Sequence, residues 1–338
     1  MHYILCKDKK WIETLEQEMT SDLTKDFETV PGLPLIKCSN NIDLRNKYLA
    51  FSSTVLLNAI ELPEDSVSKQ SAAVVECILK KFPDGAKVNY HVYSLTDKYG
   101  ILETGRAEIL KDKIHKALKK NKIFCLRKDF DRSLPFIQVC ILTDRSLAVS
   151  ILNQQEMKDY HSLVSPFVGG FSNVEEDKKA PSRAFKKIVE AQRVLGVKIQ
   201  ENETLVDLGA SPGGWTYIAR KNGAKVIALD RSELREDLMA DDMVTFLKSD
   251  AFKFQTEERI DWVVSDIICT PERILELIDL WVNNKKCSKF IFTIKFQGNS
   301  DYGILKQFKE VASLCDYQVI IKQLNVNKNE VTIMGRAL

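Results

Sequence analysis

The chain has 338 residues, 44% of them hydrophobic and 28% charged, which describes an ordinary soluble protein with two or three domains. Its formal net charge of +2 is nearly balanced, so a polyanionic partner must be met by a local basic patch rather than by overall attraction. No run of 18 apolar residues exists to cross a membrane, and no signal peptide is expected, because Tyr3–Cys6 is the only apolar run near the start.

Cysteine and histidine usage argues against a metal site. The eight cysteines are scattered without a C-x-x-C pair, and the four histidines are isolated from one another. We therefore expect no bound metal, and reduced thiols in a cytoplasmic protein. We also expect a monomer.

The N-terminal half predicts two small α+β regions, over residues 1–62 and 63–160. The first opens with a strand, a helix and a second strand, at His2–Cys6, Lys10–Thr24 and Lys47–Ser52. The second contains helices at Ser68–Phe82 and Gly105–Lys120. Its strands are expected at Lys87–Leu95, Pro135–Leu142 and Leu147–Leu152. The alternation of Phe136, Val139 and Ile141 is only partly period two, which predicts a strand buried on both faces.

Residues 161–181 contain prolines, paired glycines and a run of mixed charge, which indicates a linker. Residues 182–338 then alternate regularly between helix and strand. The strands are expected at Thr204–Leu208, Lys225–Leu229, Val244–Leu247, Asp261–Ser265, Lys289–Lys295, Tyr317–Gln323 and Glu330–Arg336. The helices are expected at Ser182–Leu195, Gly214–Asn222, Leu234–Met239, Pro271–Asn283 and Tyr302–Cys315. This order predicts a doubly wound, Rossmann-like α/β domain, with a last strand that runs antiparallel because only a short polar turn precedes it.

Residues 205–215 read LVDLGASPGGW, a short apolar strand followed by a glycine-rich turn that opens a helix. Such a loop makes a pocket for a cofactor that carries a nucleoside, since glycines allow close approach and the helix offers free N–H groups. A dinucleotide fingerprint has a glycine at the position where this chain has Ser211, and here a proline, Pro212, follows. A nicotinamide cofactor is therefore disfavoured.

Acids follow the next two strands of the predicted sheet. Asp230 is placed to accept hydrogen bonds from two ribose hydroxyls, and Asp250 to meet the exocyclic amine of an adenine. This pattern suits S-adenosylmethionine, whose sulfonium is cationic and whose ribose is unphosphorylated. The alternative is an ordinary strand-to-helix turn in which acids cap helices.

Four further polar residues are expected at the same sheet edge. Asp266 and Lys295 follow or end parallel strands, Glu330 begins the reversed strand, and Lys187 lies on the helix ahead of the first strand. Ligands of open α/β sheets bind at the carboxyl ends of the strands, so these side chains should converge. Each alone has the alternative explanation of a solvated rim residue.

The C-terminal region resembles the FtsJ-type ribose 2′-O-methyltransferases, whose catalytic set is Lys-Asp-Lys-Glu. The segment from Ser182 to Ile188 matches S-R-x-x-x-K-hydrophobic, which puts the first lysine on Lys187 rather than Lys186, and Asp207 to Trp215 matches the donor loop. The resemblance implies a catalytic set of Lys187, Asp266, Lys295 and Glu330. It implies cofactor contacts from Asp207, Gly209, Ser211, Pro212, Gly213, Gly214, Trp215, Asp230, Asp250 and Asp266.

The whole-chain layout is similar to the RlmM-type family, in which a THUMP-bearing N-terminal half precedes the methyltransferase. This resemblance implies methylation of a cytidine 2′-hydroxyl in large-subunit ribosomal RNA, either as structured RNA or in an assembly intermediate. It also implies a ferredoxin-like or THUMP-like α+β N-terminal region, with a THUMP-like RNA-binding domain at 63–160. Two positions depart from the family pattern, because Ser211 stands where cysteine is frequent and Ala184 where a cofactor-touching serine is frequent. A contact at Ala184 can therefore come only from its backbone.

A ribose hydroxyl is a weak nucleophile, so transfer needs its oxygen in line with the S–CH₃ bond at roughly 3 Å and a group to receive its proton. We expect Lys295 to be that base when its amine is neutral, with Glu330 orienting it and Lys187 holding a phosphate or ribose. Asp266 would bridge the donor's amino group and Lys295. If Lys295 stays charged, it would instead position and polarise the hydroxyl.

Other methyl acceptors are disfavoured by missing residues. Methylation of base amines typically uses an N/D-P-P-Y/F turn, where this chain has Ser265-Asp266-Ile267-Ile268, and pyrimidine carbon-5 methylation needs a nucleophilic cysteine. Cys269 is near but is interpreted as a buried or rim thiol. A non-catalytic RNA-binding or ribosome-assembly factor and a cap-type mRNA 2′-O-methyltransferase remain as alternatives.

Substrate capture is assigned to the basic helix Gly105–Lys120, as a surface that contacts phosphates of structured RNA. Its apolar side is expected to hold Ile109, Leu110, Ile114, Ala117 and Leu118. Lysines cover much of the rest, and Lys122, Arg127 and Lys128 follow. An ordinary solvated helix face is the alternative.

Overall fold

The structure is a computed structural model that describes residues 1–96, 100–102, 104–126, 130–296 and 302–338. The chain divides into two compact units, Met1–Ser172 and Asn173–Leu338. Within the described residues, no helix is both long and apolar enough to cross a membrane.

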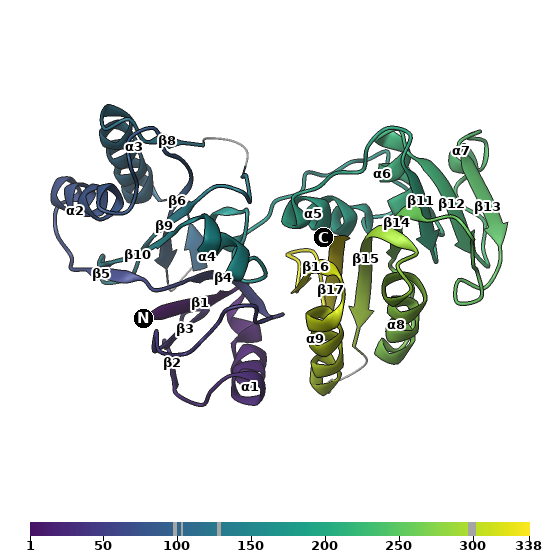
Figure 1. The fold of residues 1–338 in the computed structure, drawn as a ribbon, viewed down its shortest axis with the longest axis horizontal. Coiled ribbons are helices and arrows are strands. Elements are labelled where there is room, and N and C mark those ends of the chain that lie inside the picture. The colour runs from purple at the N-terminus through teal and green to yellow at the C-terminus, as the bar shows by residue number, and fades with distance from the viewer. Residues whose placement is uncertain (97–99, 103, 127–129, 297–301) are drawn as a thin grey trace. The chain divides into compact units, whose positions relative to one another are not determined.

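The first unit begins with an antiparallel four-stranded sheet of order β2-β3-β1-β4 (Figure 1). Its elements are β1 (His2–Cys6), α1 (Ile12–Asp22), β2 (Phe27–Thr29), β3 (Leu35–Cys38) and β4 (Ser52–Leu56). Every residue of β1 is buried, because this central strand is paired on both edges and covered on both faces.

The strand predicted at Lys47–Ser52 is wrong, since β4 starts only at Ser52. The buried carboxylate of Glu18 on α1 accepts the backbone N–H groups of Ala50 and Phe51, at 2.7 and 3.1 Å. These N–H groups are therefore satisfied by a side chain distant in sequence rather than by a strand ladder.

A second sheet of the first unit has the order β5-β10-β9-β6-β7, and β8 pairs with β6. Its strands are β5 (Ile60–Leu62), β6 (Lys87–Thr96), β7 (Gly100–Leu102), β8 (Phe124–Cys125), β9 (Phe136–Ile141) and β10 (Leu147–Leu152). The helices of this region are α2 (Val67–Leu79), α3 (Gly105–Lys120) and α4 (Gln154–Asp159).

The second sheet is covered on both faces. The helices α2 and α3 share a core with residues such as Val92 and Val139, whereas Tyr93 and Cys140 on the opposite face pack against Tyr3 and Leu56 of the first sheet. All six residues of β9 are buried, which confirms the prediction of a strand with two buried faces.

The predicted linker at 161–181 divides between the two units. Its first part packs on β4, where Val55 donates to the carbonyl of Leu163 at 3.1 Å. Its later part is tied to the second unit, since Asp177 accepts from the hydroxyl of Tyr217 and the amine of Lys221.

The second unit is a seven-stranded sheet of order β13-β12-β11-β14-β15-β17-β16. Its strands are β11 (Thr204–Leu208), β12 (Lys225–Asp230), β13 (Val244–Lys248), β14 (Ile260–Ser265), β15 (Cys287–Lys295), β16 (Tyr317–Lys322) and β17 (Glu330–Ala337). The helices are α5 (Phe185–Leu195), α6 (Gly214–Lys221), α7 (Glu236–Met239), α8 (Pro271–Ile278) and α9 (Leu305–Leu314). Figure 1 shows α5, α6 and α7 on one face of this sheet and α8 and α9 on the other.

The predicted strand directions are confirmed. The ladders β13-β12-β11-β14-β15 are parallel, and β17 is antiparallel to both β15 and β16. The start of β17 therefore lies beside the end of β15, with Glu330 opposite Lys295 in the register. The carboxyl edge of the parallel strands and the first residue of β17 thus share one side of the sheet.

Candidate functional site

The turn after β11 is shaped by three glycines that admit other parts of the chain. Gly209, at a φ of 78°, leaves space for Ile267, since a Cβ there would lie 2.9 Å from its side chain. A Cβ on Gly214 would lie 2.5 Å from the hydroxyl oxygen of Ser182, and one on Gly213, at a φ of 106°, would collide with Leu238. The glycines were predicted to admit a ligand. In the structure they admit neighbouring segments, of which Ile267 and Ser182 line a cavity and Leu238 does not.

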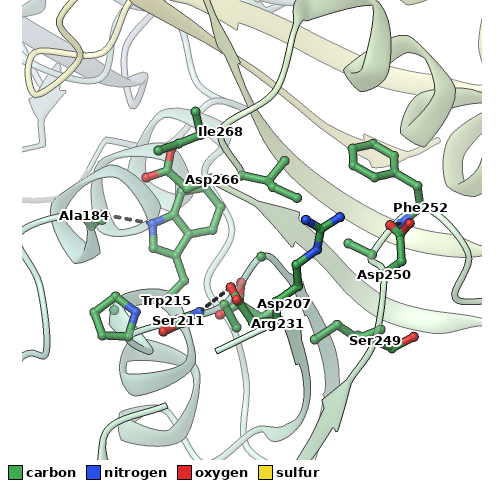
Figure 2. A pocket seen from close by; sticks show the side chains of 18 of the residues that line it. Ala184, Asp207, Ser211, Trp215, Arg231, Ser249, Asp250, Phe252, Asp266 and Ile268 are labelled. Atoms are coloured by element: carbon green, nitrogen blue, oxygen red, sulfur yellow. Dashed lines mark hydrogen bonds between the residues drawn. The ribbon is translucent and has the colours of Figure 1, made fainter. Parts of the chain in front are cut away.

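That cavity has a volume of about 700 Å³ and lies at the carboxyl edge of β11, β12 and β14 (Figure 2). Figure 2 shows Asp250 and Phe252 on one side of it and Asp266 with Ile268 on the other. Of the ten predicted cofactor residues, nine line it: Asp207, Gly209, Ser211, Pro212, Gly214, Trp215, Asp230, Asp250 and Asp266. Gly213 is the exception, because it caps α6 and faces Leu238.

Two of the lining acids are held by backbone N–H groups. Asp230 accepts from the N–H of Ser211 at 3.0 Å, which fixes the donor loop against the end of β12, and from the N–H of Ser232 at 2.9 Å. Asp250 accepts from the N–H of Phe252 at 3.0 Å. Each carboxylate is thereby oriented while it still lines the cavity.

Asp207 is the most buried of the lining acids, with 2% of its surface exposed. Burial raises the pKa of its carboxyl to about 7, against the opposing effect of hydrogen bonds from Thr216. The Thr216 hydroxyl donates to it at 2.7 Å. A cationic guest would favour the ionised form of this carboxyl.

The structure brings the four predicted catalytic residues together. The amine of Lys187 lies 2.8 Å from Oδ1 of Asp266 and 2.7 Å from Oε1 of Glu330, and the amine of Lys295 lies 2.9 Å from the same Oδ1. Their side chains are only 11–21% exposed, with Lys295 the most exposed. Two partly buried lysines, a partly buried aspartate and the buried Glu330 are thus mutually paired, as charges with little access to solvent require.

Lys187 and Lys295 differ in whether they line the cavity. Among the described residues that line it, Lys295 is present and Lys187 is not. The ion pair of Glu330 is with Lys187, although Glu330 was expected to orient Lys295. Lys186 pairs with Glu176 instead, so the assignment of the motif lysine to Lys187 rather than Lys186 agrees with the geometry.

Ala184 stands where the family often has a serine, and in the structure its backbone makes a hydrogen bond at the cavity. Ala184 lines the cavity, and its carbonyl accepts from the indole N–H of Trp215 at 2.9 Å (Figure 2). The backbone at this position thus holds the donor-loop tryptophan in place.

Sequence reasoning missed several residues that line the cavity. These are Ser182, Ala210, Leu229, Arg231, Ser249, Ala251, Phe252, Ile267, Ile268 and Arg273. Arg231 and Ser249 adjoin predicted acids and could have been found from that position. Arg273, whose guanidinium carbon lies 3.8 Å from the Phe252 ring centroid, carries no sequence signal, because the pair joins two elements.

Cys269 does not have the properties of a nucleophile. Burial raises the pKa of its thiol to about 11, so the thiolate is scarce at neutral pH. All eight cysteines are free thiols. Within the described residues, no group of three or more potential ligands is placed to hold a metal ion.

In the first unit, α3 presents a basic surface as predicted. Lys113, Lys116, Lys119 and Lys120 are exposed, whereas Ala107, Leu110, Ile114 and Leu118 are buried. Ile109 was expected on the apolar side but is 54% exposed, because it lies one residue off this stripe. Arg127 and Lys128 lie outside the described residues.

A doubly wound sheet with an antiparallel final strand and an acid-lined cavity at the carboxyl ends of β11, β12 and β14 is the arrangement expected of S-adenosylmethionine-dependent methyltransferases. The model of the FtsJ-like methyltransferase family matches residues 180–334, which are nearly the whole of the C-terminal unit and less than half of the chain.

The chain is also similar to known proteins and to solved structures. The chain is 33% identical over 180 residues to "Ribosomal RNA large subunit methyltransferase M" of Azoarcus sp. (strain BH72), covering 50% of this chain and 49% of that protein. The protein of that name from Shewanella sp. (strain MR-7) is 28% identical, with 94% of each chain covered. The fibrillarin pre-rRNA processing protein of Methanococcus jannaschii is 19% identical, with a TM-score of 0.36 over 46% of this chain and 76% of that one. The chain spans about half the length of the first relatives it matches.

Proposed function

We propose that the chain is an S-adenosylmethionine-dependent RNA ribose 2′-O-methyltransferase that acts on a cytidine of large-subunit ribosomal RNA. The observation that carries the proposal is the placement of Asp266, whose Oδ1 accepts from both Lys187 and Lys295 at the rim of the acid-lined cavity. A cavity for the methyl donor thus adjoins a lysine that can face an incoming hydroxyl.

The reaction joins the hydroxyl oxygen to the donor's methyl carbon while the S–CH₃ bond breaks, and the hydroxyl loses its proton. When bound, the donor supplies the electrophilic methyl group. Lys295 lines the cavity, so we assign it the role of general base at its amine nitrogen. If its amine stays charged, Lys295 orients and polarises the hydroxyl from the same position.

The other three residues support Lys295. Asp266 holds the amine of Lys295 through Oδ1, which restricts where that nitrogen can point. Lys187 forms ion pairs with both Asp266 and Glu330, and together with Lys295 it balances the charge of the two carboxylates. We therefore assign Lys187 a role within this charge network in place of the expected contact with a phosphate.

The substrate proposal rests on the relatives and on the first unit. Proteins named for large-subunit ribosomal RNA methylation match this chain, and the choice of a cytidine follows the RlmM-type layout of the sequence. The exposed lysines of α3 support contacts with RNA phosphates, which would set position rather than read sequence. A THUMP-like region at 63–160, a monomeric state and a cytoplasmic location remain parts of this proposal.

The test is to incubate the protein with methyl-labelled donor and ribosomal RNA from a strain that lacks it. Alkaline hydrolysis then locates the label, because a 2′-methylated ribose cannot attack its neighbouring phosphate. We expect label in one alkali-resistant dinucleotide with the wild type and with the control Lys186→Ala, and a rate of labelling lower by about 100-fold or more with Lys295→Ala. Label on a base, or equal labelling by Lys295→Ala, would overturn the proposal.

A further inference from the structure

The turn between β16 and β17 carries asparagines at three alternate positions, 325, 327 and 329, directly before Glu330. Sequence reasoning treats this segment as a polar connection. In the structure each of the three side chains binds a different part of the second unit.

Asn325 is bound by Glu190, a carboxylate of α5 that is 1% exposed. Oε1 of Glu190 accepts from the backbone N–H of Asn325 at 2.8 Å and from its side-chain amide at 3.0 Å. Glu190 follows Lys187 by three residues, so the two side chains lie on the same face of the helix. The helix that presents Lys187 therefore also holds the turn that presents Glu330.

Asn329 joins the turn to the end of β15. Its side-chain amide donates to the carbonyl of Phe296 at 3.2 Å, and its own carbonyl accepts from the N–H of Phe296 at 3.0 Å. The hydroxyl of Tyr302 donates to Oδ1 of Asn329 at 2.9 Å. Phe296 follows Lys295 directly, so this contact fixes the end of the strand that carries the proposed base.

Asn327 joins the turn to β17, the strand that follows it. Its side-chain amide donates to the hydroxyl of Thr332 at 3.0 Å, and both residues are buried. The turn is thus tied to α5, to β15 and to β17, the elements that carry Lys187, Lys295 and Glu330.

We propose that Glu190, Asn325 and Asn329 are positioning residues that hold Lys187, Glu330 and Lys295 in their paired arrangement. The inference rests on the proposed function for its catalytic consequence, although the arrangement itself can be measured on the protein alone. A buried carboxylate is costly unless its hydrogen bonds are made, and Oε1 of Glu190 accepts two of them from Asn325, the residue that begins this turn. Misplacing a reacting group by about 1 Å can slow a reaction by roughly 100-fold, so such a brace has a kinetic effect.

The test uses two disrupting variants, one conservative variant and one matched control. Glu190→Leu removes the acceptor without opening a large cavity, and Asn325→Ala removes the side-chain donor from a turn where the risk to folding is small. Glu190→Gln keeps an oxygen at the same place and should restore the behaviour of the wild type. Gln192→Leu is the control, because Gln192 lies on the same helix, is buried, and accepts the backbone N–H of Ile199 at 2.8 Å.

The first readout is the rate at which acetic anhydride labels each lysine of the full chain, followed by mass spectrometry. In Glu190→Leu and Asn325→Ala, labelling of Lys187 should rise by about tenfold relative to Lys186, the factor set by one charge-assisted hydrogen bond. In Glu190→Gln and Gln192→Leu it should stay at the wild-type rate. Unchanged labelling of Lys187 in both disrupting variants would overturn the inference.

The second readout is methyl transfer at saturating RNA and donor, with the donor Kd measured by calorimetry. The disrupting variants should lose on the order of 10-fold to 100-fold in kcat while the donor Kd is unchanged. An equal loss in Gln192→Leu would show general destabilisation and overturn the inference. Increased labelling of Lys187 combined with a wild type that transfers no methyl group would support the positioning role and refute the proposed function.

Discussion

Replacing Asp207 by asparagine should remove a pH-dependent cost to folding. This carboxyl at the end of β11 is almost fully buried, and it accepts a hydrogen bond from the hydroxyl of Thr216. Burial raises its pKa from an ordinary value of 3.8 to about 7. Asparagine keeps an oxygen to accept the Thr216 hydrogen bond but carries no charge.

The sign follows from proton binding. Between about pH 4 and pH 7 the folded chain holds a proton on Asp207 that the unfolded chain releases, so stability falls as the pH rises through this window. A pKa of about 7 makes the cost on the order of 4 kcal/mol at pH 8 and roughly 1.5 kcal/mol at pH 5. The free energy of unfolding of Asp207→Asn should therefore increase relative to that of the wild type by about 2–3 kcal/mol when the pH is raised from 5 to 8.

Urea unfolding followed by tryptophan fluorescence measures this difference in the correct part of the chain. Three of the four tryptophans, Trp215, Trp262 and Trp281, lie in the second unit. Thr216→Val should extend the loss of stability to higher pH, because its hydroxyl favours the ionised form of Asp207. A stability difference between wild type and Asp207→Asn that is equal at pH 5 and pH 8 would refute this reasoning.

Three other predictions concern pH and backbone geometry. Burial lowers the pKa of His91 to about 3, so the stability of the folded wild type falls as the pH drops below about 6.5. In urea unfolding, the difference in the free energy of unfolding between His91→Phe and the wild type should therefore grow by about 3 kcal/mol in favour of the variant from pH 7 to pH 4. Gly213→Ala should cost about 1–3 kcal/mol and lower the Tm, because its positive φ and the contact with Leu238 leave no room for a Cβ; an unchanged Tm would contradict this. The calorimetric Kd for the cationic donor should fall from pH 6 to pH 8 as Asp207 ionises, and it should be independent of pH in Asp207→Asn.

The C-terminal fold was largely predictable because most of its strands are buried apolar runs bounded by polar turns. Thr204–Leu208 has the predicted bounds, and the reversed last strand followed from the short turn before Glu330. The first unit was less predictable. Its short strands Phe27–Thr29 and Leu35–Cys38 were not predicted, and the strand predicted from Lys47 was displaced because Glu18 binds the backbone of Ala50 and Phe51.

The candidate site was predictable where chemistry follows the ends of strands. Asp266 and Lys295 could be placed by the rule that ligands bind at the carboxyl edge of a parallel sheet. The contact of Glu190 with Asn325 could not, since it joins residues 135 positions apart on a helix and a turn. The sequence pattern thus located the reacting groups, whereas the braces around them required the tertiary structure.

The central claim is that four side chains from separate elements act as one catalytic unit. Its most direct test is methyl transfer to ribosomal RNA by Lys187→Ala, Lys295→Ala and the double variant under single-turnover conditions. Because both amines bind the same oxygen of Asp266, the double variant should be within about threefold of the slower single variant. Losses that multiply in the double variant would show two independent lysines and contradict the account.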